Sequence, residues 1–174
     1  MPSRSQSATG LARVLHEIDV EDVPYLVHGG QPLLARLYKP KGQGPFPVLI
    51  DLHGGAWCNG DRTNDAVISE ALARSGVLVV AIDFRMPPEA AYPASLADIN
   101  YAVRWVRANA SRLDARADRI GFIGISSGGH QAMLAAMRPG DERYSAIATP
   151  DVARSDARVQ CVVLCWPVID PLGR

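Results

Sequence analysis

Apolar residues follow two patterns that alternate along this chain: short continuous runs, and residues at helical spacing. Continuous runs are typical of strands buried on both faces of a parallel sheet, and helical spacing is typical of amphipathic helices. The runs and two weaker leading segments predict strands at residues 16–27, 32–38, 47–52, 77–82, 119–123 and 159–168. Helical spacing predicts helices at residues 65–75, 92–110 and 127–137. This order predicts an α/β fold whose sheet is mostly parallel, with helices on both faces.

The composition places this pattern in an ordinary globular domain. The chain has 174 residues, of which 48% are hydrophobic, enough for one domain with its own core. Its 18 basic and 18 acidic residues balance, so nucleic acid and anionic membranes are not expected partners. The first ten residues lack the apolar core of a secretory signal, and no run is long enough to span a membrane. We therefore expect a cytoplasmic protein whose residues 1–15 are flexible.

The cysteines predict no special chemistry. Cys58, Cys161 and Cys165 are odd in number and do not form a close-spaced set of cysteines and histidines. This argues against a disulfide framework and against a structural zinc site. We expect small, buried or half-buried side chains there, and neither a metal nor a cofactor.

A candidate nucleophile lies between the fifth predicted strand and the third predicted helix. The sequence Gly-Ile-Ser-Ser-Gly that starts at Gly124 fits the G-x-S-x-G pattern in the strand–turn–helix context that this pattern requires. Ser126 would lie on a sharp turn, and Gly124 and Gly128 would allow the close packing around it. The backbone N–H of Ser127, at the helix N-terminus, could face a developing oxyanion. Ser127 is the competing nucleophile, and a glycine-rich loop with incidental serines is the structural alternative.

A second glycine-rich segment, His-Gly-Gly-Ala-Trp from His53 to Trp57, follows the third predicted strand. The loop after the third strand supplies the other part of an oxyanion hole in hydrolases with this pattern. Gly55 and Ala56 are the preferred N–H donors, with Gly54 as the third candidate. His53 is more consistent with holding the loop than with acting as base, since such sites place the base last in the chain. Trp57 either walls the acyl pocket or simply packs.

Together these blocks resemble the α/β-hydrolase esterase and lipase family, in its hormone-sensitive-lipase-like, feruloyl-esterase-like and kynurenine-formamidase-like branches. The resemblance implies the α/β-hydrolase fold and hydrolysis of a carboxylic ester or aryl formamide through an acyl-enzyme on Ser126. Within this family, Trp57 and the block Gly60-Asp61-Arg62 favour an aryl ester or formamide as the substrate. The matching blocks are His53 to Trp57, Gly60-Asp61-Arg62, Asp83-Phe84-Arg85, Pro88-Glu89, Tyr92-Pro93-Ala94, Gly124 to His130 and Trp166 to Asp170.

The chain departs from this family after Ser126. The triad order is serine, acid and histidine, but the one later histidine is His130, a single helical turn away, where we expect it to pack. Asp170 could be an acid only in some arrangements. The resemblance therefore makes residues 1–174 the N-terminal portion of a single α/β-hydrolase domain, truncated after the sixth strand. A fragment, a second chain that supplies the rest, and a naturally short relative remain alternatives.

Two functions remain open from the sequence. One is a serine hydrolase of small esters or amides that alone has little activity, because the acid and base are absent. The other is a non-catalytic fragment or subunit that pairs through its last strand, with a complementing C-terminal chain or a second copy as partner. In both, Asp83 and Arg85 are expected to be structural, as a local ion pair.

Overall fold

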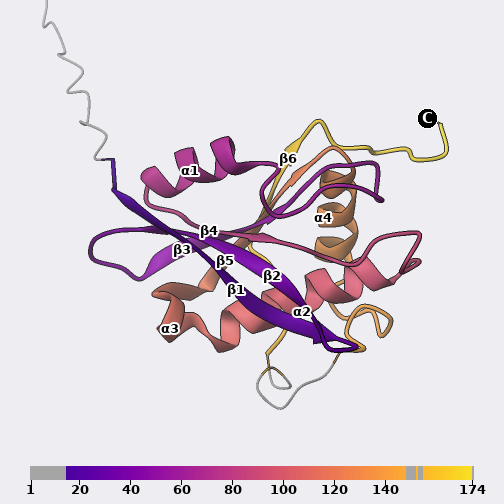
Figure 1. Ribbon diagram of the computed structural model, residues 1–174, viewed down its shortest axis with the longest axis horizontal. Helices are drawn as coiled ribbons and strands as arrows, with labels where there is room; N and C mark the ends of the chain where they lie inside the picture. The colour runs from indigo at the N-terminus through magenta and orange to yellow at the C-terminus, as the bar shows by residue number, and fades with distance from the viewer. Residues whose placement is uncertain (1–14, 148–151, 153–154, 174) are drawn as a thin grey trace, which may run out of the picture.

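A six-stranded sheet forms the centre of the molecule (Figure 1). The computed structural model describes residues 15–147, 152 and 155–173, so the expected flexible segment lies outside the described residues except for Leu15. The strands run in the spatial order β1-β2-β4-β3-β5-β6. Their bounds are β1 Ile18–His28, β2 Gln31–Pro40, β3 Phe46–Leu52, β4 Leu78–Ile82, β5 Ala115–Ile125 and β6 Cys161–Cys165.

The sheet changes from antiparallel to parallel along this order. β1 pairs with β2 and β2 pairs with β4 in antiparallel fashion. β4, β3, β5 and β6 then pair in parallel. Each parallel pair needs a crossover, which the helices between the strands provide. The predicted mostly parallel sheet is therefore confirmed.

Helices cover both faces of the sheet, as predicted (Figure 1). α1 packs on one face over a small core that includes Tyr38 and Val79. α2 and α4 cover the main core on the opposite face. The short α3 was not predicted, because a single residue separates it from α2. The helix bounds are α1 Ala66–Arg74, α2 Ala94–Ala108, α3 Ala110–Leu113 and α4 Ser127–Met137.

β3 shows why the central strands read as continuous apolar runs. Val48, Ile50 and Leu52 are buried in the main core. Leu49 and Asp51 alternate with them along the strand, and Asp51 accepts a hydrogen bond from Ser69 of α1. Because helices cover both faces, neither set of side chains needs to be polar for solvation.

β6 is the outer strand of the sheet, and it is shorter than expected. The predicted strand covered residues 159–168, whereas β6 spans only Cys161–Cys165. Trp166 takes a positive φ of 48°, which turns the chain out of the sheet. Among the described residues, no strand pairs with the outer edge of β6.

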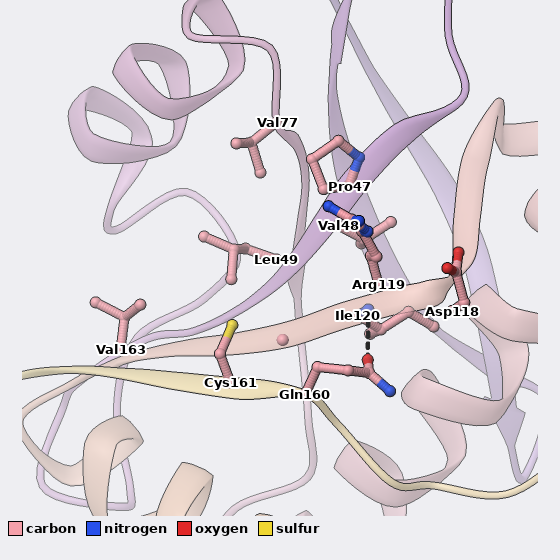
Figure 2. Close-up of a pocket in the computed structure, with 11 residues that line it drawn as sticks. Pro47, Val48, Leu49, Val77, Asp118, Arg119, Ile120, Gln160, Cys161 and Val163 are labelled. Atoms are coloured by element: carbon pink, nitrogen blue, oxygen red, sulfur yellow. Dashed lines mark hydrogen bonds between the residues drawn. The ribbon is translucent and has the colours of Figure 1, made fainter.

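An apolar groove lies beside β6 on the face that carries α1. Its volume is about 520 Å³. Figure 2 shows Leu49, Val77, Cys161 and Val163 around it, with Asp118 and Arg119 at one end. Val163 is 42% exposed, which is unusual for an apolar side chain on a sheet face. The sheet thus has an uncovered apolar surface at this edge.

In the described part of the chain, no helix has both the length and the apolar character needed to cross a membrane.

Candidate active site

The carboxyl ends of β3 and β5 bring the two predicted motif loops together. The strands are neighbours, and Leu52 pairs with Gly124 in their parallel register. His53 follows the end of β3, and Ser126 follows the end of β5. Ligands bind in open α/β sheets at this edge. The fold therefore places both motifs at one site.

Ser126 lies on a strained turn between β5 and α4. Its φ is 54° and its ψ is −117°, outside the regions that non-glycine residues normally populate. Its N–H donates to the carbonyl of Cys165 at 2.9 Å, and its carbonyl accepts from Val168 N–H at 3.2 Å. The side chain is partly exposed, and its hydroxyl has no hydrogen-bond partner among the described residues. The backbone is fixed while the hydroxyl remains available.

Close packing explains the glycines around this turn. A Cβ at Gly124 would lie 2.6 Å from the carbonyl oxygen of Gly128. A Cβ at Gly128 would overlap the carbonyl oxygens of Leu52 and His53. Real Cβ atoms do not approach backbone this closely, so any side chain at these positions would push α4 away from the ends of β3 and β5.

Ser127 differs from Ser126 in its accessibility. It is the first residue of α4 and is only 1% exposed. Its Oγ is buried and has no partner in the described part of the chain. A substrate carbonyl cannot reach this hydroxyl without movement of α4. The N–H of Ser127, at the helix N-terminus, lies where a helix favours negative charge.

The loop after β3 has an unusual backbone. Gly55, Ala56 and Trp57 take positive φ values of 128°, 52° and 66°. Gly54 approaches the serine turn so closely that a Cβ there would lie 3.3 Å from Ser126 Cβ. Among the described residues, the N–H groups of Gly55 and Ala56 find no acceptor. Unsatisfied donors beside a partly exposed serine are what binding of a substrate oxygen requires.

His53 lies beneath this loop and not beside Ser126. It is 3% exposed, and its ring stacks on Phe84 at 4.3 Å between centroids. Its Nδ1 donates to the carbonyl of Gly54 at 2.8 Å, and its Nε2 has no partner in the described chain. These contacts suit the structural role favoured from the sequence.

His130 contacts Trp57. The indole Nε1–H of Trp57 donates to His130 Nδ1 at 3.2 Å, and the two rings meet edge to face. Burial lowers the pKa of His130 below its usual value of 6.5, which favours the neutral ring that can accept this bond. His130 thus links α4 to the loop that carries Trp57, and Trp57 packs against the helix.

Asp83 and Arg85 do not pair with each other, which corrects the expected local ion pair. Asp83 pairs with Arg62 at 3.0 Å, and Arg62 also reaches Asp22 of β1 at 2.8 Å. The two guanidinium groups of Arg36 and Arg62 hold the pKa of Asp22 well below its usual range. Arg62 therefore ties the loop after β3 to β1 and to the end of β4. This three-residue contact is called the Arg62 clasp below.

Arg85 instead joins a second cluster, which is centred on Asp98. Its guanidinium donates to Asp98 of α2 at 2.8 Å, and His28 contacts the same carboxylate at 2.9 Å. Asp98 is completely buried. The sequence indicated a structural role for Arg85 but not its partner Asp98, which lies 13 residues from Arg85 and 70 residues from His28. A polar residue within the apolar stripe of α2 was the available signal for Asp98.

Two carboxyl groups lie behind the loop, and the sequence analysis did not single them out. Asp51 is 4% exposed, and Ser69 donates to its Oδ2 at 2.8 Å. Burial raises the pKa of Asp51 to about 7, with Asp65 nearby. Burial also raises the pKa of Asp65. In the sequence, Asp51 is the polar residue within the apolar run of residues 47–52. A buried carboxyl group normally has a hydrogen-bond partner, so this position indicated that one exists.

Asp170 makes its hydrogen bonds within a local turn. Its Oδ1 accepts from the N–H groups of Leu172 and Gly173, each at 3.1 Å. The described residues contain no cluster of three His, Cys, Asp or Glu side chains that could hold a metal ion.

Known esterases resemble this chain. The family model described as BD-FAE matches residues 36–172. The versiconal hemiacetal acetate esterase of Dothistroma septosporum is 38% identical over 103 residues, which are 58% of this chain and 31% of that protein. Esterase LipC of Mycobacterium tuberculosis is 37% identical over 121 residues, which are 68% and 29% of the two chains. The chain therefore spans about a third of these relatives' length.

A solved structure agrees with these relatives. The hyperthermophilic esterase from the archaeon Pyrobaculum calidifontis superposes with a TM-score of 0.75 at 29% sequence identity. The match covers 91% of this chain and 47% of that one. Nearly all of the described sheet thus has a counterpart in about half of an esterase.

Proposed function

The chain belongs to the BD-FAE family, and from this we propose that it carries the nucleophile and the oxyanion-binding loop of a serine esterase. Its fold is that of the α/β-hydrolase esterases, as the sequence predicted. The relatives named as esterases support hydrolysis of a carboxylic ester as the reaction.

The observation that carries the proposal is the contact between the loop after β3 and the serine turn. Ser126 Oγ would attack the ester carbonyl carbon, and the alcohol would leave with a proton to give an acyl-enzyme that water then hydrolyses. The N–H groups of Gly55, Ala56 and Ser127 would stabilise the oxyanion, with Gly54 as a further donor. Loss of one such donor typically costs about 10²–10³ in rate.

Ser126 needs a base, and we infer that this chain does not supply one. His130 is the one histidine after Ser126 in the sequence, and its Nδ1 already accepts from Trp57. Without a base the serine hydroxyl is a weak nucleophile, and loss of the base in a comparable triad costs about 10⁶ in turnover. We therefore expect the isolated chain to be nearly inactive and a C-terminal complement to provide acid and base.

The nucleophile assignment is tested by covalent labelling. The chain, extended with the C-terminal part of LipC as a fusion or a second chain, is treated with a fluorophosphonate probe and its peptides are mapped. We expect the label on Ser126, no label in Ser126→Ala, and label retained in the control Ser127→Ala. Label on another residue, or undiminished labelling of Ser126→Ala, would refute the assignment.

A small cavity beside the loop supports a short acyl or aryl group on the substrate. It measures about 140 Å³ and is lined in part by Trp57, Tyr92, Leu96 and Leu134. A cavity of about 150 Å³ holds a benzene-sized group. Rates on an aryl acetate, a feruloyl ester and N-formylkynurenine would separate the substrate classes. Cleavage of long-chain lipid esters alone would contradict this size limit.

The exposed edge supports a second candidate function, a non-catalytic subunit. The outer edge of β6 and the groove at Val163 offer backbone and apolar surface for a complementing chain or a second copy (Figure 2). This candidate predicts a stable oligomer without ester turnover, measured by light scattering and an aryl acetate assay. A monomer that turns over ester would exclude it.

A further inference from the structure

A second cavity lies at the opposite end of the sheet from Ser126. It measures about 250 Å³ and is lined by residues of α2, of the segment after α4 and of the segment that leads into β6. Because α4 runs from the carboxyl ends of the strands back to their amino ends, Pro139 and Arg158 mark the amino-terminal edge of the sheet. The candidate active site does not use this cavity.

The wall of this cavity contains a buried cation. Arg104 of α2 is only 6% exposed. Its Nε donates to Asn100 Oδ1 at 2.9 Å, and its Nη2 donates to the carbonyl of Ile147 at 2.7 Å. Its guanidinium also lies 5.6 Å from the centre of the Tyr101 ring. A guanidinium has five N–H donors, so these bonds leave three without an acceptor among the residues that the structure describes.

No carboxylate of the described residues compensates this charge. In the described part of the chain, Arg104 takes part in no ion pair. Burial lowers its pKa, but a guanidinium stays protonated at neutral pH. Burial of a charge without a counter-ion is costly, so such groups are normally paired or bound to an ion.

The other charges around the cavity leave a positive surplus. Asp156 lines it, but its carboxylate pairs with Arg107 at 2.9 Å. Arg158 lines it as well, and its side chain makes no ion pair within the described residues. Ser155 adds a hydroxyl to the wall. Among the described residues, the cavity is thus lined by two arginines that make no ion pair and by one aspartate that is already paired with Arg107.

We propose that this cavity binds a phosphate-type oxyanion, held by the guanidinium groups of Arg104 and Arg158. Guanidinium forks match the geometry of phosphate oxygens and form short, charge-assisted hydrogen bonds with them. The volume accommodates a phosphoryl group with part of the molecule that carries it. The proposal is independent of ester hydrolysis, so either one can fail without the other.

The test is thermal unfolding of the full chain during titration with inorganic phosphate, with sodium chloride adjusted to keep ionic strength constant. A ligand that binds the folded state alone raises the unfolding midpoint, by about 5–10 °C at a hundredfold its Kd for a chain of this size. Binding is measured independently from the ³¹P NMR line width of phosphate. We expect a saturable rise in midpoint and broadening of the phosphate signal.

Variants connect the effect to the cavity. Arg104→Gln should abolish the rise in unfolding midpoint with phosphate. Arg158 is exposed, so Arg158→Gln should fold normally and raise the Kd for phosphate about tenfold. The matched control Arg74→Gln, on the exposed face of α1, should respond as the unmodified chain does. An unchanged Kd in Arg158→Gln, or equal protection by acetate, would overturn the proposal.

Discussion

Asp51 offers a stability test of the region behind the oxyanion loop. The carboxyl group is 4% exposed, and its Oδ1 has no partner among the described residues. Burial raises its pKa from 3.8 to about 7. The folded state therefore binds the proton more tightly than the unfolded state, and the stability that this provides is complete below pH 3.8 and lost as the pH rises through 7.

The size of the effect follows from the pKa. Each unit of difference is worth about 1.4 kcal/mol, so a rise from 3.8 to about 7 corresponds to about 4 kcal/mol between acidic and alkaline pH. Asparagine at this position is neutral at every pH and keeps an oxygen that Ser69 can donate to. From pH 5 to pH 8, the free energy of unfolding of Asp51→Asn should therefore rise by about 3 kcal/mol relative to that of the unmodified chain.

Urea unfolding at pH 5, 6, 7 and 8, followed by tryptophan fluorescence, measures this gap. The control Asp118→Asn removes an exposed carboxylate that Arg116 stabilises in its charged form, and it should not gain stability at pH 8. A gap for Asp51→Asn that does not change with pH would mean that Asp51 is ionised throughout, and it would refute the argument from burial.

Three further predictions address packing, pH and association. Gly128→Ala should destabilise the fold by about 3 kcal/mol in urea unfolding, because its Cβ would overlap backbone oxygens, whereas Gly140→Ala, with open space around it, should be nearly neutral. Neutral His130 should contribute stability above pH 6.5, and this contribution should be lost as the pH falls through its lowered pKa. The variant His130→Gln keeps an acceptor for Trp57, so its free energy of unfolding should decline less from pH 7 to pH 5 than that of the unmodified chain. An equal decline would contradict this link. Val163→Lys should reduce self-association measured by light scattering, whereas Val67→Lys, on exposed α1, should not; equal effects would exclude the β6 groove as the contact.

The sequence predicted the elements whose signal is local. The apolar run of β3 and the Gly-Ile-Ser-Ser-Gly turn before α4 depend on residues close together in the chain, and the structure places them where the patterns indicated. The structure also places both motif loops at the carboxyl ends of neighbouring parallel strands, where Leu52 and Gly124 are paired.

The rest depends on contacts between distant residues, which leave no local pattern. Trp57 and His130 are 73 residues apart, and the partner of Arg85 lies on another element. The length of β6 was overestimated because apolar composition continues to residue 169, while the turn at Trp166 is set by the backbone. Burial of Arg104 likewise appears only once the elements pack.

The Arg62 clasp has a consequence for how this family varies. Asp22 lies 40 residues before Arg62, and Asp83 lies 21 residues after it. Both carboxylates nevertheless accept hydrogen bonds from the one guanidinium of Arg62. Loss of Arg62 leaves the partly buried carboxylate of Asp83 without its counter-ion, whereas Asp22 keeps Arg36 as a partner. Related sequences should therefore keep Arg62 and Asp83 together or lose them together, whereas Asp22 can be retained for its pair with Arg36.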